Sequence, residues 1–462
     1  MPWVSPRSSP LPQVSGESGS EMSVTPSSIE HFSWGRYPRA NHASIHWANW
    51  TDELPQILAD APSASLLPYG LGRSYGDSCL NNGRGVVECS RLNRILGFDT
   101  EQGILHCESG VSLSDILDVC VPKGWFLPVT PGTRFVTVGG AIANDVHGKN
   151  HHRAGTFGCH VRRLGLLRSD RGFLECSPDM NRDWFSATIG GLGLTGVITS
   201  AEIQLRPIQG PMIDHESIPF HSLDQFLALC RESDAQFEYT VAWIDALSGR
   251  DARGIFFRGN HSARPGTVNL NAAGPRVPFA FPTWVLNQLA LKLFNHAYYQ
   301  WNWLRKGKSA LPYDSFFYPL DAIREWNLIY GDRGFLQYQC VIPNTDVPAF
   351  EELLRRIRQA GMGSFLGVMK QFGTIESPGM LSFPRPGLTL ALDFPMQGDR
   401  TLRLMSDLDL LVQQSGGALY PAKDARMPPA MFKMSFPRWR DFQFFIDPKL
   451  SSSFWRRVIE ES

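Results

Sequence analysis

Four glycine-rich loops constrain the fold of this chain more than any other feature of its sequence. They occupy residues 68–77, 131–144, 145–155 and 190–198. Glycine lets a ligand approach the main chain without a side chain in the way, and successive N–H groups in such loops bind anions. Serine, threonine and asparagine donors lie between the glycines. The pattern favours one extended ligand that carries a pyrophosphate; the alternative is four unrelated tight turns.

The common nucleotide-binding fingerprints do not fit these loops. Gly70 and Gly72 are followed by Tyr75 where a Rossmann fingerprint needs its third glycine. The second candidate, at 191–196, has the G-x-G-x-x-G spacing, but no acidic ribose partner follows it in a βαβ unit. No GK[ST] sequence is present, so a Walker loop is excluded. A dinucleotide would therefore have to bind to a different fold.

Charge and cysteine content narrow the class of protein. Lys plus Arg and Asp plus Glu both number 44, which argues against a nucleic-acid partner because such proteins carry a basic surplus. The 8 cysteines include no CxxC pair, and we expect reduced, mostly buried thiols in a cytoplasmic protein. Residues 1–27 are rich in Ser and Pro and lack an apolar signal region. We expect a disordered leader there, with translation starting at Met1 or Met22.

The order of expected elements predicts an α+β protein. Strand-like runs at 86–89, 104–107 and 197–205, with a capped helix that begins at Ser112 and stops at Gly124, indicate a first domain over 28–208. A second domain over 209–415 alternates strands with amphipathic helices, which predicts an antiparallel sheet covered by helices. Its strands are expected at 239–243, 335–342 and 388–394, and its helices at 222–231 and 347–360.

Residues 265–330 are rich in proline and aromatic side chains. The aromatic residues are Trp284, Tyr298, Tyr299, Trp301, Trp303, Phe316, Phe317 and Tyr318. They are interpreted either as core packing, or as a mobile lid or a surface that contacts lipid. The most apolar stretch, 277–291, is too short for a membrane span and is interrupted by proline, asparagine and glutamine.

Three stretches carry a resemblance to a known family: 70–77, 131–140 and 145–152. They are similar to the FAD-binding domain of the vanillyl-alcohol-oxidase superfamily, also called PCMH-type. The similarity extends over about 35–455 and includes 364–373 and Tyr-Pro-Ala-Lys-Asp at 420–424. Within the superfamily, the chain most resembles the branch that oxidises the 2′-hydroxyl of a polyprenylphosphoryl-β-D-ribose. The resemblance implies an FAD domain at 28–208, a substrate domain at 209–415, and a segment at 416–462 that returns to the flavin.

The resemblance also implies roles for individual residues. Lys423 and His147 are expected to be catalytic: a cationic Lys423 stabilises negative charge on the reduced flavin, and His147 either accepts the hydroxyl proton or serves as a structural hydrogen-bond partner. The sugar or its phosphate is expected to contact Tyr75, Lys370, Gln337, Gln339, Phe372 and Thr389. The expected FAD-binding residues are Gly70, Leu71, Gly72, Arg73, Ser74, Tyr75, Pro131, Gly132, Thr133, Thr137, Val138, Gly139, Gly140, Asn144, His147, Gly148, Lys149, Asn150, Gly155, Gly196, Val197, Ile198, Tyr420 and Lys423.

Alternation along 335–342 places Gln337 and Gln339 on one face of a strand, and the resemblance places that face over the flavin. Two departures from the family matter. The first loop lacks the histidine that tethers FAD in many members, so FAD is expected to be non-covalent. Ala391 stands where mycobacterial members have a cysteine, so thiol-directed inhibition is not expected at that position.

The resemblance implies hydride transfer from a secondary sugar hydroxyl to FAD, as the first half of an epimerisation to arabinose. The implied partners are a sugar or lipid-linked sugar phosphate, a short-chain reductase that completes the epimerisation, and the inner face of a membrane. The alternatives are an aldonolactone or alditol oxidase and a non-catalytic flavin-binding protein. A zinc hydrolase using His147, His151 and His152 is a poorer interpretation, because Gly148 and Asn150 disfavour the helix it needs.

Overall fold

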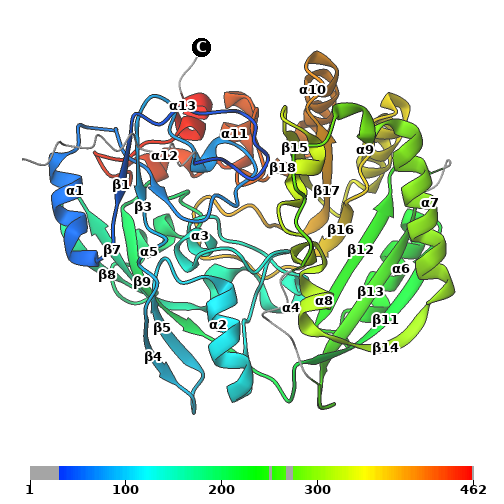
Figure 1. Cartoon of the computed structure of the whole chain (residues 1–462), viewed down its shortest axis with the longest axis horizontal. Helices are drawn as coiled ribbons and strands as arrows, with labels where there is room; N and C mark the ends of the chain where they lie inside the picture. Colours follow the sequence, from blue (N-terminus) through cyan, green and yellow to red (C-terminus); the bar gives the residue numbers. More distant parts are fainter. Residues whose placement is uncertain (1–30, 249–251, 267–273, 460–462) are drawn as a thin grey trace, which may run out of the picture. The chain divides into compact units, whose positions relative to one another are not determined.

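The structure is a computed structural model that describes residues 31–248, 252–266 and 274–459. The expected leader at 1–27 lies outside these ranges. From Phe32 onward the chain forms one compact unit. Its helices and strands confirm the predicted α+β class (Figure 1). The domain boundaries at 208 and 415 stay predictions.

Two sheets form from the segment before residue 205. A three-stranded parallel sheet has the order β1 (Ser44–Trp47), β3 (Gly85–Glu88) and β2 (Pro68–Tyr69). An antiparallel sheet has the order β4 (Ile95–Asp99), β5 (Ile104–Glu108), β9 (Val197–Gln204), β7 (Val161–Arg168) and β8 (Gly172–Cys176). A short antiparallel pair joins β10 (Arg206–Pro207) to β6 (Trp125–Phe126).

Helix α2 (Leu113–Cys120) shows how closely local sequence sets its boundaries. Ser112 caps it by accepting a hydrogen bond from the Asp115 N–H, and Asp115 accepts one from the Ser112 N–H, which is the predicted capping box. The chain leaves the following 3₁₀ turn at Gly124 with a φ of 81°. The predicted start and stop of this helix are confirmed.

An eight-stranded antiparallel sheet forms from the rest of the chain. Its order is β14 (Gly307–Pro312), β11 (Met212–Phe220), β13 (Arg253–Ser262), β12 (Tyr239–Asp245), β16 (Gly367–Phe372), β17 (Gly387–Pro395), β15 (Phe335–Ile342) and β18 (Ala418–Leu419). The predicted strands at 239–243, 335–342 and 388–394 are confirmed. The edge strand β18 is the point where the C-terminal segment joins this sheet.

The two faces of the large sheet have different neighbours. Helices α6 (Leu223–Ser233), α9 (Val347–Ala360) and α10 (Asp399–Gln414) pack on one face and form an apolar core with Leu336, Tyr338 and other side chains of the strands. Helix α7 (Gln288–Leu304) packs on the opposite face, where Tyr299 contacts Trp243 and Ile255. Side chains of β15, β16 and β17 line a cavity, which contains the candidate site.

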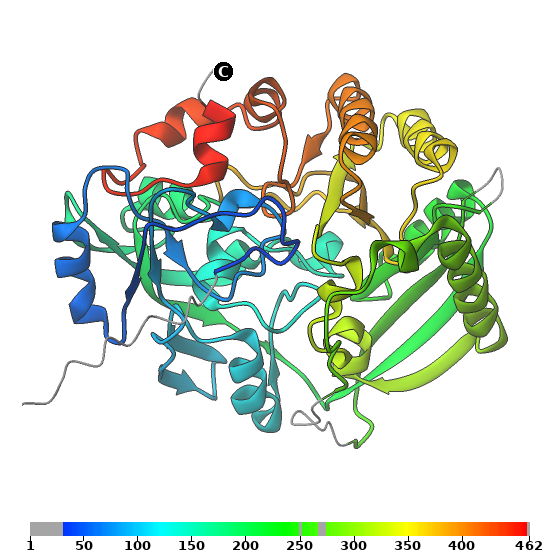
Figure 2. The same ribbon diagram turned by 45° about the horizontal axis from the view of Figure 1, so that its top comes forward.

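The C-terminal helices return to the N-terminal part of the unit. Helices α11 (Pro429–Ser435), α12 (Trp439–Gln443) and α13 (Ser453–Ile459) follow the large sheet in the chain, and α13 lies beside the 3₁₀ turn Asp77–Cys79 (Figure 2). The Ser453 N–H donates to the Leu80 carbonyl, 2.8 Å away. This return brings the end of the chain next to the first glycine loop.

The remaining helices are short and precede the large sheet, except for one. They are α1 (Leu54–Asp60), α3 (Val138–Ala143), α4 (His151–Ala154), α5 (Arg182–Thr188) and, after α7, α8 (Tyr313–Phe317). Among the described residues, no helix is both long enough and apolar enough to cross a membrane. All eight cysteines are free thiols, and most are buried, as predicted.

The aromatic segment 265–330 is buried at one end and exposed on α7, although 267–273 lie outside the described residues. Phe316, Phe317 and Tyr318 are buried in the core beneath the five-stranded sheet. Trp301 and Trp303 are exposed on α7. Core packing therefore explains one end of the segment, and a separate explanation is needed for α7.

Candidate functional site

A cavity of about 1740 Å³ runs from the glycine loops to the large sheet and on to α7. The sheet contributes a row of alternating side chains from β15, β16 and β17. These are Gln337, Gln339, Val368, Lys370, Thr389 and Ala391. Gln337 and Gln339 thus share the cavity face, as their spacing predicted.

Glycine in the first loop is required by close packing at two positions. At Gly76, a Cβ atom would lie 1.6 Å from the Asp424 carbonyl oxygen, so only glycine lets the two segments touch. At Gly72, φ is +60° and a Cβ atom would lie 2.1 Å from the Tyr69 hydroxyl oxygen. The Tyr75 N–H donates to the Ala422 carbonyl at 2.9 Å. The first loop is therefore fixed against residues 422–424 of the C-terminal segment.

The second loop uses its N–H groups inside the protein. The Val138 N–H donates to the Val111 carbonyl, the Gly139 N–H to the Ser109 carbonyl, and the Gly140 N–H to the Thr137 hydroxyl that caps α3. These three donors are not available to an anion. Gly139 and Gly140 also line the cavity, where the absence of a side chain leaves room for a ligand.

Four N–H groups of the first loop, in contrast, are not used as donors among the described residues. Among the hydrogen bonds of the described residues, none has the N–H of Gly70, Leu71, Gly72 or Arg73 as its donor. All four residues line the cavity. Successive free N–H groups around a glycine at positive φ form an anion-binding concavity. The first loop is therefore the better candidate for contact with a phosphate group.

Two buried polar atoms at the cavity support this assignment. Within the described ranges, the Ser109 Oγ and Arg73 Nε atoms are buried without a hydrogen-bond partner, and both residues line the cavity. The Arg73 guanidinium lies 4.0 Å from the centroid of the Trp34 ring, which holds it in place. Unsatisfied buried polar groups are costly. A ligand with hydrogen-bonding groups and negative charge, as in FAD, would satisfy them.

A chain of polar side chains crosses the sheet face of the cavity. Lys370 Nζ donates to His147 Nδ1 at 3.0 Å and to the Gly148 carbonyl at 3.2 Å. When Lys370 carries its charge it can only donate, so Nδ1 is then the acceptor. On the other side of the ring, Gln339 Nε2 lies 2.9 Å from His147 Nε2 and also donates to the Thr389 hydroxyl at 3.4 Å. Both nitrogens of the imidazole are therefore engaged.

Burial and neighbouring cations keep His147 neutral. The imidazole has Phe372, Phe383 and Tyr420 around it, with ring centroids 4.8 to 6.1 Å away. Burial, followed by the positive charge of Lys370, holds the His147 pKa well below its usual value. At neutral pH the imidazole is uncharged and acts as a fixed hydrogen-bonding group.

Three lysines point toward this region from different elements. Burial lowers the pKa of Lys149, Lys370 and Lys423 to about 7 each. Lys149 Nζ also donates to the Phe316 carbonyl. Amines with such pKa values exist in both charged and neutral forms near neutral pH. The cavity can therefore attract an anion and can also exchange a proton.

Lys423 reaches the cavity from the C-terminal segment. Its Nζ atom lies 3.6 Å from the centroid of the Tyr75 ring, in a cation–π contact. Tyr420 is buried nearby, and its hydroxyl donates to the Asn144 carbonyl at 2.9 Å. A buried carboxyl, Asp393, raises the Lys423 pKa and opposes the effect of burial. Lys423 thus lies where the first glycine loop meets the cavity face of the large sheet.

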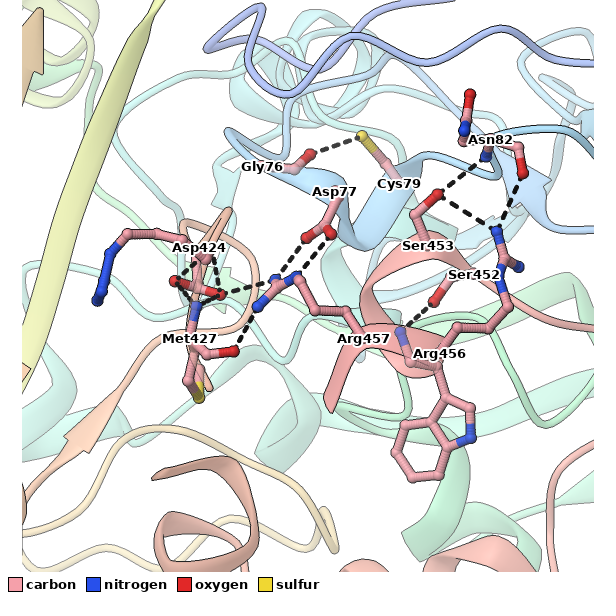
Figure 3. Close-up of polar contacts among 12 residues, drawn as sticks. Gly76, Asp77, Cys79, Asn82, Asp424, Met427, Ser452, Ser453, Arg456 and Arg457 are labelled. Carbon is pink, nitrogen blue, oxygen red and sulfur yellow. Dashed lines mark hydrogen bonds and ion pairs between the residues drawn. The ribbon is translucent and has the colours of Figure 1, made fainter. Parts of the chain in front are cut away.

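A buried ion-pair cluster fixes the segment that carries Lys423 (Figure 3). Arg457 of α13 pairs with Asp77 at 2.7 Å and with Asp424 at 2.9 Å. Asp424 also accepts hydrogen bonds from the Met427 N–H. One guanidinium therefore joins the first glycine loop to the residue that follows Lys423.

The structure brings most of the predicted residues together at the cavity and leaves five away from its lining. Val138 and Val197 are buried in the core, and Phe372 packs against the outer side of His147. The Asn150 amide donates to the Pro128 carbonyl and to Glu238, and Gly155 faces Ile375 and Cys159. The other predicted binding residues all line the cavity.

Some cavity residues lie outside the four predicted loops and were not predicted, notably Trp34 and Ser109. Asp393, which lies just outside the lining, was also missed. Its side chain is buried, accepts a hydrogen bond from Gln337 at 2.6 Å, and has a pKa raised by burial to about 7. The sequence did offer a sign of this residue: Asp393 is the single acidic residue in the apolar run 388–394, and acidic side chains are rarely buried in a strand unless they are paired.

The structure does not form the alternative metal site. The three histidines do not share one helix. His151 and His152 lie in α4, whereas His147 precedes α4 and forms a β-bridge with Thr156. In the described part of the chain, no group of three or more His, Cys, Asp or Glu side chains is arranged to hold a metal.

The comparisons with known proteins agree on one family of FAD-linked proteins. The FAD binding domain family matches residues 45–177, which include the first three glycine loops. A decaprenylphosphoryl-β-D-ribose oxidase of Mycolicibacterium smegmatis is 36% identical over 408 residues, covering 84% of this chain and 88% of that protein. An uncharacterized protein of Streptomyces coelicolor is 31% identical over 351 residues, covering 72% and 94%. An L-gulonolactone oxidase of Scyliorhinus torazame is 31% identical over 159 residues, covering 34% and 36%.

Proposed function

Because the chain belongs to the FAD-dependent oxidoreductases of the vanillyl-alcohol-oxidase (PCMH) type, we propose that it oxidises a secondary hydroxyl of a sugar. The proposed substrate is a polyprenylphosphoryl-β-D-ribose, oxidised at its 2′-hydroxyl. The relative from Mycolicibacterium smegmatis, which is similar over most of both chains, supports this substrate class. The observation that carries the proposal is one cavity that joins the free N–H groups of the first loop, the three buried lysines and the aromatic helix α7.

The residues at the cavity fit FAD as a resident cofactor. The N–H groups of 70–73, the Ser109 hydroxyl and the Arg73 guanidinium would hold its phosphate and sugar groups. FAD would supply the two-electron acceptor for the hydride that leaves the sugar carbon. No histidine lies in the first loop, and we propose that the cofactor is held without a covalent bond.

The lysines and the His147 chain have complementary proposed roles. His147 is neutral, and both of its ring nitrogens are engaged by Lys370 and Gln339, so it orients these two side chains and does not take the hydroxyl proton. Lys370 and Lys423 have pKa values of about 7, so their neutral forms can accept that proton at neutral pH. The charged form of Lys423 stabilises negative charge that develops beside it. Lys370 and Lys149 attract the phosphate of the substrate.

The remaining partners follow from the same chemistry. Oxidation of the 2′-hydroxyl gives a ketone. A short-chain reductase that returns a hydride to the other face of that carbon would complete the epimerisation to arabinose.

Anaerobic mixing of the purified protein with a panel of sugars tests the proposal. The panel contains polyprenylphosphoryl ribose, tail-free ribose phosphate and an aldonolactone. We expect rapid bleaching of the flavin absorption with the lipid-linked sugar and slower bleaching with its tail-free form. Bleaching by the aldonolactone alone would identify an aldonolactone oxidase. Stable FAD binding without bleaching by any polyol would indicate a non-catalytic flavin protein.

A further inference from the structure

Helix α7 exposes a row of large apolar side chains. Leu289, Leu293 and Leu304 are 67%, 62% and 75% exposed, and Trp303 is 41% exposed. The other side of the helix is held in place, because Leu291, Asn295 and Tyr299 are buried. Asn295 donates to Asp245 at 2.9 Å. The apolar row is therefore a fixed surface on a packed helix, and exposed patches of this kind mark interaction sites.

The charged residues of α7 and of the start of β14 are all basic. Lys292, Arg305, Lys306 and Lys308 are exposed, and no Asp or Glu occurs between Arg276 and Tyr313. The Lys306 ammonium lies 4.4 Å from the centroid of the Trp303 ring, so a basic group and an apolar ring share one place on the surface. Apolar and aromatic side chains with lysine and arginine beside them are typical of helices that lie in a membrane interface.

The same helix forms part of the opening of the cavity. Phe294, Trp301 and Arg305 are exposed to solvent and also line the cavity. The cavity therefore reaches the surface next to the apolar row. Figures 1 and 2 show α7 at the outer side of the large sheet, on the right.

We propose that the α7 surface, made of Leu289, Lys292, Leu293, Trp303, Leu304 and Lys306, docks on a bilayer that contains anionic lipids. The apolar side chains enter the interface and the lysines contact lipid phosphates. A second copy of the same surface is a poorer partner, because it would bring these lysines close to one another. Docking places the cavity mouth at the lipid surface; that it admits a lipid-linked sugar there rests on the proposed function.

Co-sedimentation of the purified holoprotein with vesicles tests the docking without any turnover. We expect binding to vesicles of phosphatidylglycerol and phosphatidylcholine, weaker binding to phosphatidylcholine alone, and release by high salt. The double variant L289E/L293E should bind on the order of tenfold or more weakly. Leu410→Glu is the matched control, because Leu410 is 53% exposed on α10, away from this surface. It should bind like the wild type.

Four outcomes are informative. Equal vesicle binding by L289E/L293E and the wild type, with FAD content and circular dichroism unchanged, overturns the proposal, and so does absence of binding by the wild type. A dimer in sedimentation velocity that L289E/L293E abolishes would assign the surface to a second copy instead. Loss of binding to lipid in K292E/K306E supports the charge contribution. Since Leu289 and Leu293 do not line the cavity, flavin bleaching by a tail-free sugar stays unchanged, and failure of docking is thereby distinguished from failure of the reaction.

Discussion

At the scale of single residues, the site depends on charges that burial has changed. Lys149, Lys370 and Lys423 come from three separate segments, yet each has a pKa lowered to about 7 for the same reason: the cavity wall excludes water. Their charges are therefore sensitive to what the cavity holds. The predictions for single residues concern these charges and the glycines that make room for a ligand.

Lys423→Met should abolish most flavin reduction while leaving the fold intact. The change removes the charge beside Tyr75 without removing the bulk of the side chain. We expect flavin reduction to slow by on the order of 10²–10³-fold, the usual effect of losing one buried electrostatic donor. Stopped-flow reduction measures it. Lys423→Arg restores the charge and should recover part of the rate; near-normal reduction in Lys423→Met would remove Lys423 from the mechanism.

Affinity for a phosphate-bearing substrate should fall as pH rises through about 7. The amines are cationic below their pKa and neutral above it, so the attraction for phosphate is present at pH 6 and is lost by pH 9. A pH profile of the affinity for ribose phosphate, taken from its dissociation constant, checks this, because kcat/KM would also contain the proton transfer to a neutral lysine. In Lys370→Met the profile should be lower and flatter, and an identical profile in this variant would exclude Lys370 as a phosphate contact.

Gly140→Val should reduce FAD binding. Gly140 lines the cavity, and a Cβ atom there would lie 3.0 Å from the Thr137 hydroxyl that caps α3. A branched side chain would occupy ligand space and disturb the cap. The ratio of visible to ultraviolet absorbance of the purified protein measures FAD content. Gly97→Val is the control, because an added Cβ at Gly97 has no neighbour within 4 Å, and this variant should keep its FAD.

At the scale of elements, α13 controls how the first glycine loop meets the C-terminal segment. Its Arg457 is the shared partner of Asp77 and Asp424, both buried. The loop at 70–77 and the segment at 420–424 each contribute a flavin-side residue, Tyr75 and Lys423. Their relative position is therefore set by a helix near the end of the chain.

Arg457→Met should cost about 3–5 kcal/mol of unfolding free energy, because it leaves two buried carboxylates without their cation. Burial already raises the pKa of Asp77 despite the ion pair. Chemical denaturation followed by circular dichroism measures the loss. Arg438→Met on the exposed surface before α12 is the control, with an expected change of about 0–1 kcal/mol. A similar small change in Arg457→Met would show that the cluster does not stabilise the fold.

At the scale of the whole molecule, segments from distant parts of the chain line the cavity, and the first glycine loop contains no histidine that could tether FAD. FAD should therefore leave the protein when it unfolds. We expect acid precipitation to release the yellow colour into the supernatant. Colour retained in the precipitated pellet would show a covalent bond and would point to one of the cavity's other nucleophilic side chains, such as Cys79 or His147.

The sequence by itself determined the local features of this protein. The capping box at Ser112, the helix over 347–360 and the alternation of Gln337 and Gln339 follow from interactions between residues a few positions apart, which are legible in the order of residues. The capping box, the helix and the alternation are confirmed in the structure. The glycine loops predict a ligand that contacts the backbone, and this stays a prediction.

Only the tertiary structure decided which of these features work together. It placed Lys370 against His147 and Arg457 against Asp77, contacts between residues more than two hundred positions apart. It also showed that the N–H groups of 138–140 are used within the fold, whereas those of 70–73 remain for a ligand. The reason is physical: a donor's partner, and the burial that shifts a pKa, depend on which distant segments pack together, and no local pattern encodes that choice.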